Sequence, residues 1–127
     1  MVLTFDQAAE TLDALAEHFP AVLFEELNGG VNLLEDAVPD PDFPEGEMYI
    51  LGEYCEDILG RYINLYYGSF AAVLADEPRE VWVEELRTTL RHELTHHVER
   101  LAGDRSLEYR DMEELAAFQS DWTDGEE

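Results

Sequence analysis

The segment from Arg79 to Ala102 limits how this chain can fold more than any other, because it contains neither glycine nor proline. Asp76-Glu77-Pro78 precedes it, and an acid followed by a proline is typical of a helix start. Gly103 follows it, and glycine is typical of the position where a helix stops. The sequence therefore predicts one long helix over residues 79–102.

This long helix is expected to have an apolar face and an opposite polar face. At about 100° per residue, an arc of about 120° contains the residues that should pack inward: Leu86, Leu90, Leu94, Val98 and Leu101. His92 and His96 lie about 40° apart on the other side of the helix. His97 falls inside the apolar arc, so we expect it to pack in the core or to support other residues.

Residues 92–96 read HELTH, a pattern typical of a zinc-binding helix that carries its own base. Residues four apart lie one turn apart on the same face, so His92 and His96 can bind one metal ion. Glu93 projects beside that ion, where a carboxylate can accept a proton from metal-bound water. By chance alone the pattern occurs roughly once in a few hundred chains of this length. The position of the pair outside the apolar arc favours a metal site over an accident.

The composition bounds the class of protein. A chain of 127 residues is expected to form one domain, residues 1–127, with a frayed tail at 123–127. The hydrophobic content of 46% argues against disorder despite a net charge of −24, and all seven basic residues are arginine. Such a surface disfavours nucleic acids and anionic membranes and attracts divalent metals and cationic peptides. Alternatively, the acids serve only to solvate the surface.

The single cysteine, Cys55, excludes an internal disulfide and a thiolate metal cluster. We expect it to be a buried or half-buried thiol without a chemical role. The N-terminus has neither a basic stretch nor a long apolar run, which argues against a signal peptide or a membrane span. The expected location is the cytoplasm.

Turn residues and hydrophobic spacing predict the remaining elements. These are a helix near 4–18 with a Thr4–Gln7 capping box, a short helix from Pro20 to Leu27, strands at 31–38, 48–54 and 62–67, helical turns at 70–75, and a last helix within 107–122 with Leu115, Ala116 and Phe118 inward. Gly68-Ser69 should end the third strand. The order predicts an α+β fold, a small three-stranded sheet packed on the long helix with flanking helices.

A catalytic zinc site normally has three protein ligands, so the histidine pair leaves one ligand to find. The sequence after the motif offers only acids. Glu99 shares the histidine face but lies two turns from His92, which favours a supporting or surface role. Glu108 and Asp111 lie where the chain can fold back towards the metal. We prefer Asp111, with Glu108 and Glu99 as alternatives; Asp111 could equally be a helix cap.

Three segments are distinctive together: FEELNGGV at 24–31, GRYINLYYGSF at 60–70 and HELTHH at 92–97. They resemble the small bacterial zincin-like metallopeptidases, short acidic proteins long catalogued as of unknown function. The resemblance covers nearly the whole chain, from about residue 5 to residue 120. It implies a minimal zincin-like fold, a metal held by the two histidines of the motif, and the motif's glutamate as general base.

Many members of that family have a glycine three residues after the second histidine and an aspartate three residues further on, the expected third ligand. Here Glu99 occupies the glycine position, and Gly103 comes one helical turn later. Extra residues out and back would return Asp111 to the place of that aspartate. The departure affects the third ligand and leaves the histidine pair as expected.

The sequence therefore predicts a zinc-dependent metallopeptidase with one zinc ion per chain. Zinc would lower the pKa of its water towards ~7, and Glu93 would take the proton and pass it to the leaving amine. Tyr67 would donate a hydrogen bond to the developing oxyanion, with Tyr66 and Tyr109 as alternatives. The substrate would be a peptide, preferably cationic, paired with an exposed sheet edge.

Two other classes of protein remain open at this point. One is a non-catalytic metal-binding zincin-like module that binds a peptide or protein partner without turnover. The other is a structural protein in which the HELTH pattern is accidental.

Overall fold

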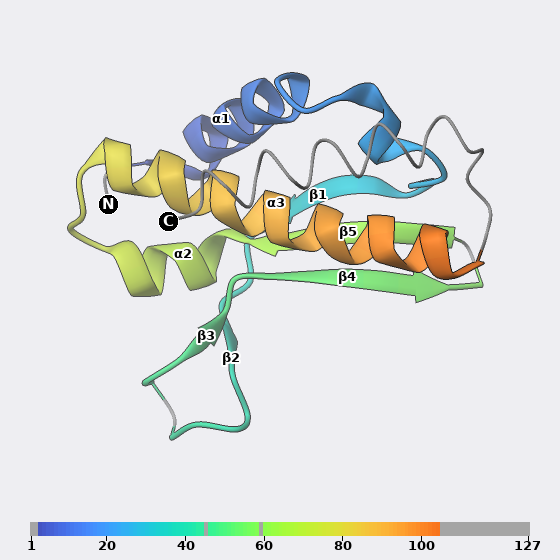
Figure 1. Ribbon diagram of the computed structural model, residues 1–127. Helices are drawn as coiled ribbons and strands as arrows, with labels where there is room; N and C mark the ends of the chain where they lie inside the picture. Colours follow the sequence, from blue (N-terminus) through green and yellow to red (C-terminus); the bar gives the residue numbers. More distant parts are fainter. Residues whose placement is uncertain (1–2, 45, 59, 105–127) are drawn as a thin grey trace, which may run out of the picture.

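The computed structural model describes residues 3–44, 46–58 and 60–104, and it confirms an α+β fold (Figure 1). In chain order the elements are α1 (Phe5–Glu17), the 3-10 helix η1 (Ala21–Phe24), β1 (Gly30–Leu34), β2 (Val38–Pro39), β3 (Tyr49–Ile50), β4 (Gly52–Asp57), β5 (Gly60–Tyr66), α2 (Tyr67–Leu74) and α3 (Arg79–Asp104). The predicted last helix within 107–122, with Leu115, Ala116 and Phe118, and the tail at 123–127 lie outside the described residues.

The first predicted helix is confirmed together with its capping box. The Thr4 hydroxyl accepts the Gln7 backbone N–H at 3.1 Å, and the Gln7 side chain accepts the Thr4 N–H at 3.0 Å. Each residue thus satisfies a backbone donor that the start of a helix leaves without a partner. Ala8 and Leu12 are buried on the inner face of α1.

The central sheet has the order β1-β5-β4, with β1 parallel and β4 antiparallel to β5. The hairpin β2–β3 forms a second, separate sheet that stands away from the body of the protein (Figure 1). The predicted strand at 31–38 was too long, because β1 ends at Leu34 and Val38 pairs with Ile50 in the hairpin. The predicted strand at 48–54 is divided at Leu51 into β3 and β4.

A crossing of the chain over α2 explains these breaks. The segment that leaves β1 passes directly over Gly68, where an added Cβ would lie 2.6 Å from the backbone nitrogen of Ala37. The Ser69 hydroxyl accepts the backbone N–H of Val38 at 2.9 Å. Gly68-Ser69 therefore lies within α2 and positions the crossing chain; the prediction that it ends a strand was wrong.

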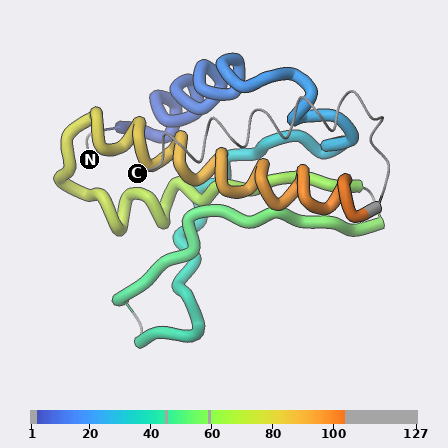
Figure 2. The backbone as a smooth tube through the Cα atoms, in the orientation of Figure 1, coloured from blue at the N-terminus to red at the C-terminus, as the bar shows by residue number. Residues whose placement is uncertain are grey.

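Helix α3 lies along β4 and β5, and α1 packs against it (Figure 2). All five residues predicted to face inward on α3 are buried, with exposed fractions of 6% or less. All of them except Leu101 join Ile63 and Leu65 of β5 in the main core cluster. The helix begins directly after Pro78, as predicted, but continues through Gly103 to Asp104, so Gly103 lies in its last turn.

None of the helices in the described part of the chain combines the length and the apolar composition that a bilayer span requires.

Candidate metal centre

The rings of His92 and His96 converge on the exposed side of α3. Their Nε2 atoms are 3.1 Å apart, and their ring centroids are 4.6 Å apart. An ion placed about 2.0–2.1 Å from both nitrogens, the usual zinc distance, would have an N–Zn–N angle of about 100°, near the tetrahedral value. The predicted convergence of the two imidazoles on one helix face is therefore present, and the donor pair fits zinc.

Glu93 lies beside this pair but points into the space between α3 and β4. It is 6% exposed, and this burial raises the pKa of its carboxyl, while the charges of His92 and His96 act in the opposite direction. The carboxylate accepts a hydrogen bond from the backbone N–H of Tyr54. A carboxylate whose pKa is raised holds a proton more readily than an ordinary glutamate, as a general base requires.

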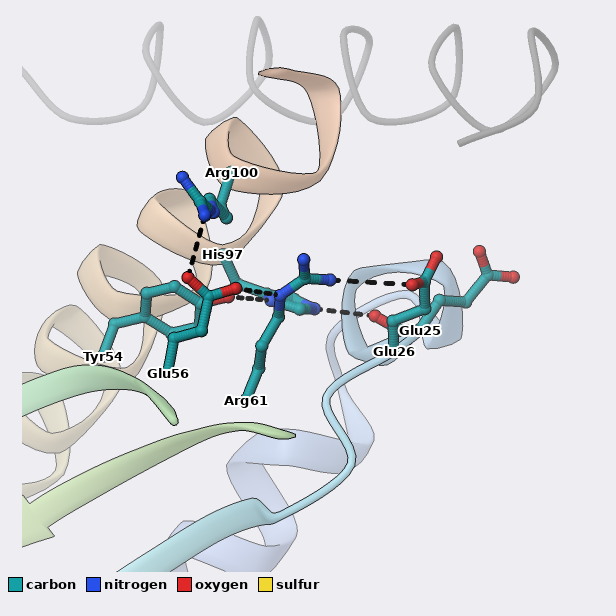
Figure 3. Close-up of polar contacts among 7 residues, drawn as sticks. All are labelled: Glu25, Glu26, Tyr54, Glu56, Arg61, His97 and Arg100. Carbon is teal, nitrogen blue, oxygen red and sulfur yellow. Dashed lines mark hydrogen bonds and ion pairs between the residues drawn. The ribbon is translucent and has the colours of Figure 1, made fainter. Parts of the chain in front are cut away.

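His97 is fully buried, as its position in the apolar arc predicted, and it is hydrogen-bonded at both ring nitrogens. Nε2 lies 2.7 Å from the carbonyl oxygen of Glu25, and Nδ1 lies 2.8 Å from the hydroxyl of Tyr54 (Figure 3). A carbonyl oxygen can only accept, so Nε2 carries the hydrogen and Nδ1 accepts the tyrosine O–H. Burial also lowers the pKa of the imidazole, which favours this neutral form.

The contact with His97 explains why the predicted helix from Pro20 to Leu27 is only a four-residue 3-10 helix. Glu25 has an extended backbone, and Glu26 has a φ of 61°, in the left-handed region. This conformation turns the Glu25 carbonyl towards α3 instead of into a helical hydrogen bond. A tertiary contact thus overrides the local helical preference.

Four charged side chains surround this contact on the exposed side (Figure 3). Arg61 lies 3.6 Å from Glu26 and 2.8 Å from Glu56, and Arg100 of α3 lies 3.0 Å from Glu56. The hydrogen bond from Arg61 lowers the pKa of the Glu56 carboxyl. Each of these exposed ion pairs contributes little to the stability of the protein. Together they link the turn after η1, the β4–β5 hairpin and the end of α3.

A hollow of about 580 Å³ opens beside His96 on this side of the protein. It is lined by Tyr54, Glu56, His96, Glu99, Arg100 and Gly103. Its walls come from the edge strand β4 and the C-terminal turns of α3, so a chain lying along β4 would pass through it.

The third ligand predicted for the metal, Asp111, and its alternative Glu108 both lie outside the described residues. The other alternative, Glu99, has its carboxylate 3.9 Å from Nδ1 of His96, the ring nitrogen that faces away from His92. Glu99 therefore approaches the far side of the ring, as a supporting residue would. Within residues 3–44, 46–58 and 60–104, no three His, Cys, Asp or Glu side chains are grouped closely enough to hold a metal.

Tyr67, the predicted oxyanion donor, is not brought to the histidine pair. Its hydroxyl donates to the carbonyl oxygen of Leu3 at 2.6 Å, and its ring packs against Phe5 and Trp82. Trp82 precedes His92 by ten residues on α3, or about 15 Å along the helix axis. Because β5 ends one residue earlier than predicted, Tyr67 begins α2 and helps to hold the N-terminus.

Of the two alternative oxyanion donors, Tyr66 and Tyr109, the structure describes Tyr66. Tyr66 is buried and donates its hydroxyl to Glu53 at 2.6 Å; burial and this bond raise its pKa to about 12. Its hydroxyl is therefore held in its protonated, donating form close to the edge strand. Tyr109 lies outside the described residues. Cys55 is half-buried, as expected, and burial raises the pKa of its thiol.

Sequence analysis did not single out Tyr54, although the structure gives it contacts to both Glu93 and His97. Alternate residues of a strand share a face, so Gly52 and Tyr54 turn to the same side of the sheet. The spacing of an aromatic residue two positions after a glycine could have indicated a strand face packed closely on a helix.

We expect Gly52→Ala to destabilise the protein by about 1–3 kcal/mol, because overpacking at this contact has no room to relax. An added Cβ would lie 2.9 Å from Cγ2 of Thr89 and 3.2 Å from the carbonyl oxygen of Asn64. Gly103→Ala is the matched control, since no described atom lies within 4 Å of its added Cβ and alanine favours helix. Urea unfolding of both variants measures the difference. Equal midpoints would show that β4 and α3 are not in close contact at Gly52.

Comparison with known proteins relates this chain to a solved structure. No family model and no curated protein matches the chain. Among solved structures, it is similar to a conserved hypothetical protein from Thermo thermophilus, with 34% sequence identity and a TM-score of 0.70. The match covers 80% of this chain and 99% of the other. With this identity over nearly all of the relative, the chain belongs to the same protein family as that conserved hypothetical protein.

Proposed function

We propose that the protein is a zinc-dependent, zincin-like metallopeptidase with one zinc ion per chain. The observation that carries this proposal is the convergence of His92 and His96 to 3.1 Å beside the buried carboxylate of Glu93. Two imidazole nitrogens and one carboxylate are a known set of protein ligands for catalytic zinc, which keeps a further position for water. Asp111 remains the preferred third ligand.

Glu93 is the residue that would transfer the proton of the attacking water. When bound, zinc supplies a Lewis acid that acidifies a water molecule and polarises the scissile carbonyl. Glu93 accepts the proton as the water oxygen adds to the carbonyl carbon, and it returns the proton to the nitrogen of the leaving amine. The burial that raises the pKa of Glu93 helps it to hold this proton between the two steps.

The outer edge of β4 is the proposed place for an extended peptide. The backbone N–H of Tyr66 donates to the carbonyl oxygen of Leu51. In an antiparallel pair, the backbone N–H and C=O groups of every second residue from there point to the partner strand. Gly52, Tyr54 and Glu56 accordingly turn their backbone groups away from β5. The Tyr54 N–H is bonded to the Glu93 carboxylate, and Tyr54 and Glu56 line the hollow beside His96. A peptide strand added to this edge would run past the two imidazoles.

The net charge of −24 leads us to expect cationic peptides as preferred substrates. A basic peptide library should be hydrolysed faster than a neutral one at low salt, because exposed acids attract cations over a long range when screening is weak. The difference should shrink as the salt concentration rises. Equal rates for the two libraries at low salt would remove the preference while leaving the peptidase proposal in place.

Hydrolysis of a mixed peptide library by the zinc-loaded protein, before and after chelation of the metal, tests the proposed activity. We expect cleavage that is lost with a chelator and restored by zinc. A second candidate is a metal-binding module without turnover, which is favoured by the hydrogen bond that already engages the Glu93 carboxylate. Zinc binding without cleavage, unaffected by Glu93→Gln, would support that candidate and contradict the peptidase.

A further inference from the structure

We propose that Tyr54 and His97 are positioning residues, which together fix the edge strand β4 at the point on α3 where its backbone holds the Glu93 carboxylate. The positional part of this inference stands on the contacts alone. Its consequence for catalysis rests on the proposed function.

The segment HELTHH carries two interleaved pairs of residues, each four apart. His92 and His96 form the first pair and face outward, with their Nε2 atoms 3.1 Å apart. Glu93 and His97 form the second pair and are both buried, at 6% and 0% exposure. Glu93 follows His92 by one residue, and His97 follows His96 by one residue. The second pair therefore lies about 100° further around the helix than the first. One helix face is therefore available for the metal and the next for the sheet.

Tyr54 contacts both members of the buried pair. Its backbone N–H is bonded to the Glu93 carboxylate, and its hydroxyl is bonded to Nδ1 of His97 at 2.8 Å. A single strand residue thus spans one helical turn between two fixed points. These two contacts add to the packing of Gly52 on Thr89 and to the Arg100–Glu56 ion pair in setting the position of β4 along the axis of α3.

His97 can serve as a fixed point because a second hydrogen bond, on the other side of its ring, fixes its position. Its Nε2–H donates to the Glu25 carbonyl oxygen at 2.7 Å, so both nitrogens of the buried ring have partners. The turn that presents this carbonyl is braced by Arg61, which pairs with Glu26 and Glu56 (Figure 3). Removing the tyrosine hydroxyl would leave Nδ1 of His97 without its donor in the core.

Tyr54→Phe tests the positional part directly, because it removes only this hydroxyl and retains the ring, whose centroid lies 5.3 Å from that of His97. Tyr62→Phe is the matched control: it removes a hydroxyl of the same hairpin that donates to Asp57 at 3.1 Å. The measurement is amide hydrogen exchange by NMR on the metal-free protein. The Leu90 amide, in the middle of α3, reports global unfolding.

We expect the amide of residue 54 to exchange about tenfold faster in Tyr54→Phe, with the Leu90 amide much less affected and with no such change in Tyr62→Phe. Unchanged exchange at residue 54 would overturn the positional inference. An equal increase at Leu90 would also overturn it, because the hydroxyl would then contribute only to general stability. Neither result depends on whether the protein is a peptidase.

If the wild type hydrolyses peptides, the same variants test the catalytic part. Tyr54→Phe should lower kcat by about tenfold, since small misplacements of a catalytic group are costly, while KM and zinc content stay near their wild-type values. Tyr62→Phe should retain the wild-type kcat. Equal kcat in the two variants would contradict the role of Tyr54 in aligning Glu93, without affecting the peptidase proposal.

Discussion

Glu93→Gln should lower the rate of peptide hydrolysis by about 10³-fold and leave zinc binding intact. General base catalysis typically contributes about 10²–10⁴-fold, and glutamine cannot accept the proton. Glutamine has the same shape and can still accept the Tyr54 N–H, so the contact between β4 and α3 is retained. Peptide cleavage and zinc content measured on the same preparation test this. Cleavage at the wild-type rate with zinc bound would exclude Glu93 as the base.

The same substitution should stabilise the metal-free protein at neutral pH. Burial raises the pKa of Glu93 in the folded state, so the ionised carboxylate opposes folding at any pH above that raised value. The stability difference between Glu93→Gln and wild type should shrink as the pH falls through the folded pKa, and it should vanish below the ordinary glutamate pKa of about 4.3. Urea unfolding at several pH values measures this. A variant less stable than wild type at neutral pH would contradict the cost assigned to Glu93.

The second large effect is expected for His92→Ala and His96→Ala. Each substitution should lower the affinity for zinc by at least about 100-fold, because even residues that only support the ligands of a metal site contribute about 10–100-fold to the affinity. Zinc content should fall from about one ion per chain to a small fraction. His18→Ala is a suitable control, because His18 is exposed at the end of α1 and its ring is hydrogen-bonded locally, to the Ala14 carbonyl oxygen. Full zinc content in both variants would show that the pair does not bind the metal.

Asp111→Ala in the same measurement addresses the third ligand. We expect zinc content to fall, because two imidazoles alone make a weak site. Unchanged zinc content would return the assignment to Glu108 or Glu99 and would leave the histidine pair unaffected.

The parts of the fold that depend on local periodicity could be predicted from the sequence. The inward face of α3, the outward histidine pair and the capping box of α1 all follow from the spacing of residues within one helix. The α+β class follows from the order of such elements. The position of Glu93 beside the histidine pair follows in the same way, since it directly follows a histidine on a helix.

The parts that were missed depend on contacts between distant segments. The end of β1 and the start of α2 are determined by the close crossing at Gly68, and η1 is shortened by the bond between Glu25 and His97. Tyr67 was predicted as the oxyanion donor, whereas in the structure it begins α2 and its hydroxyl donates to the Leu3 carbonyl oxygen. No local pattern within these segments contains that information.

X-ray absorption at the zinc edge of the loaded protein tests most directly whether His92 and His96 share one zinc ion. We predict scattering from two imidazoles at about 2.0–2.1 Å, with oxygen ligands completing the site, and a reduction to one imidazole in any zinc that His96→Ala retains. A spectrum with oxygen ligands only would contradict the account, because the zinc would then be bound by surface acids instead of by α3.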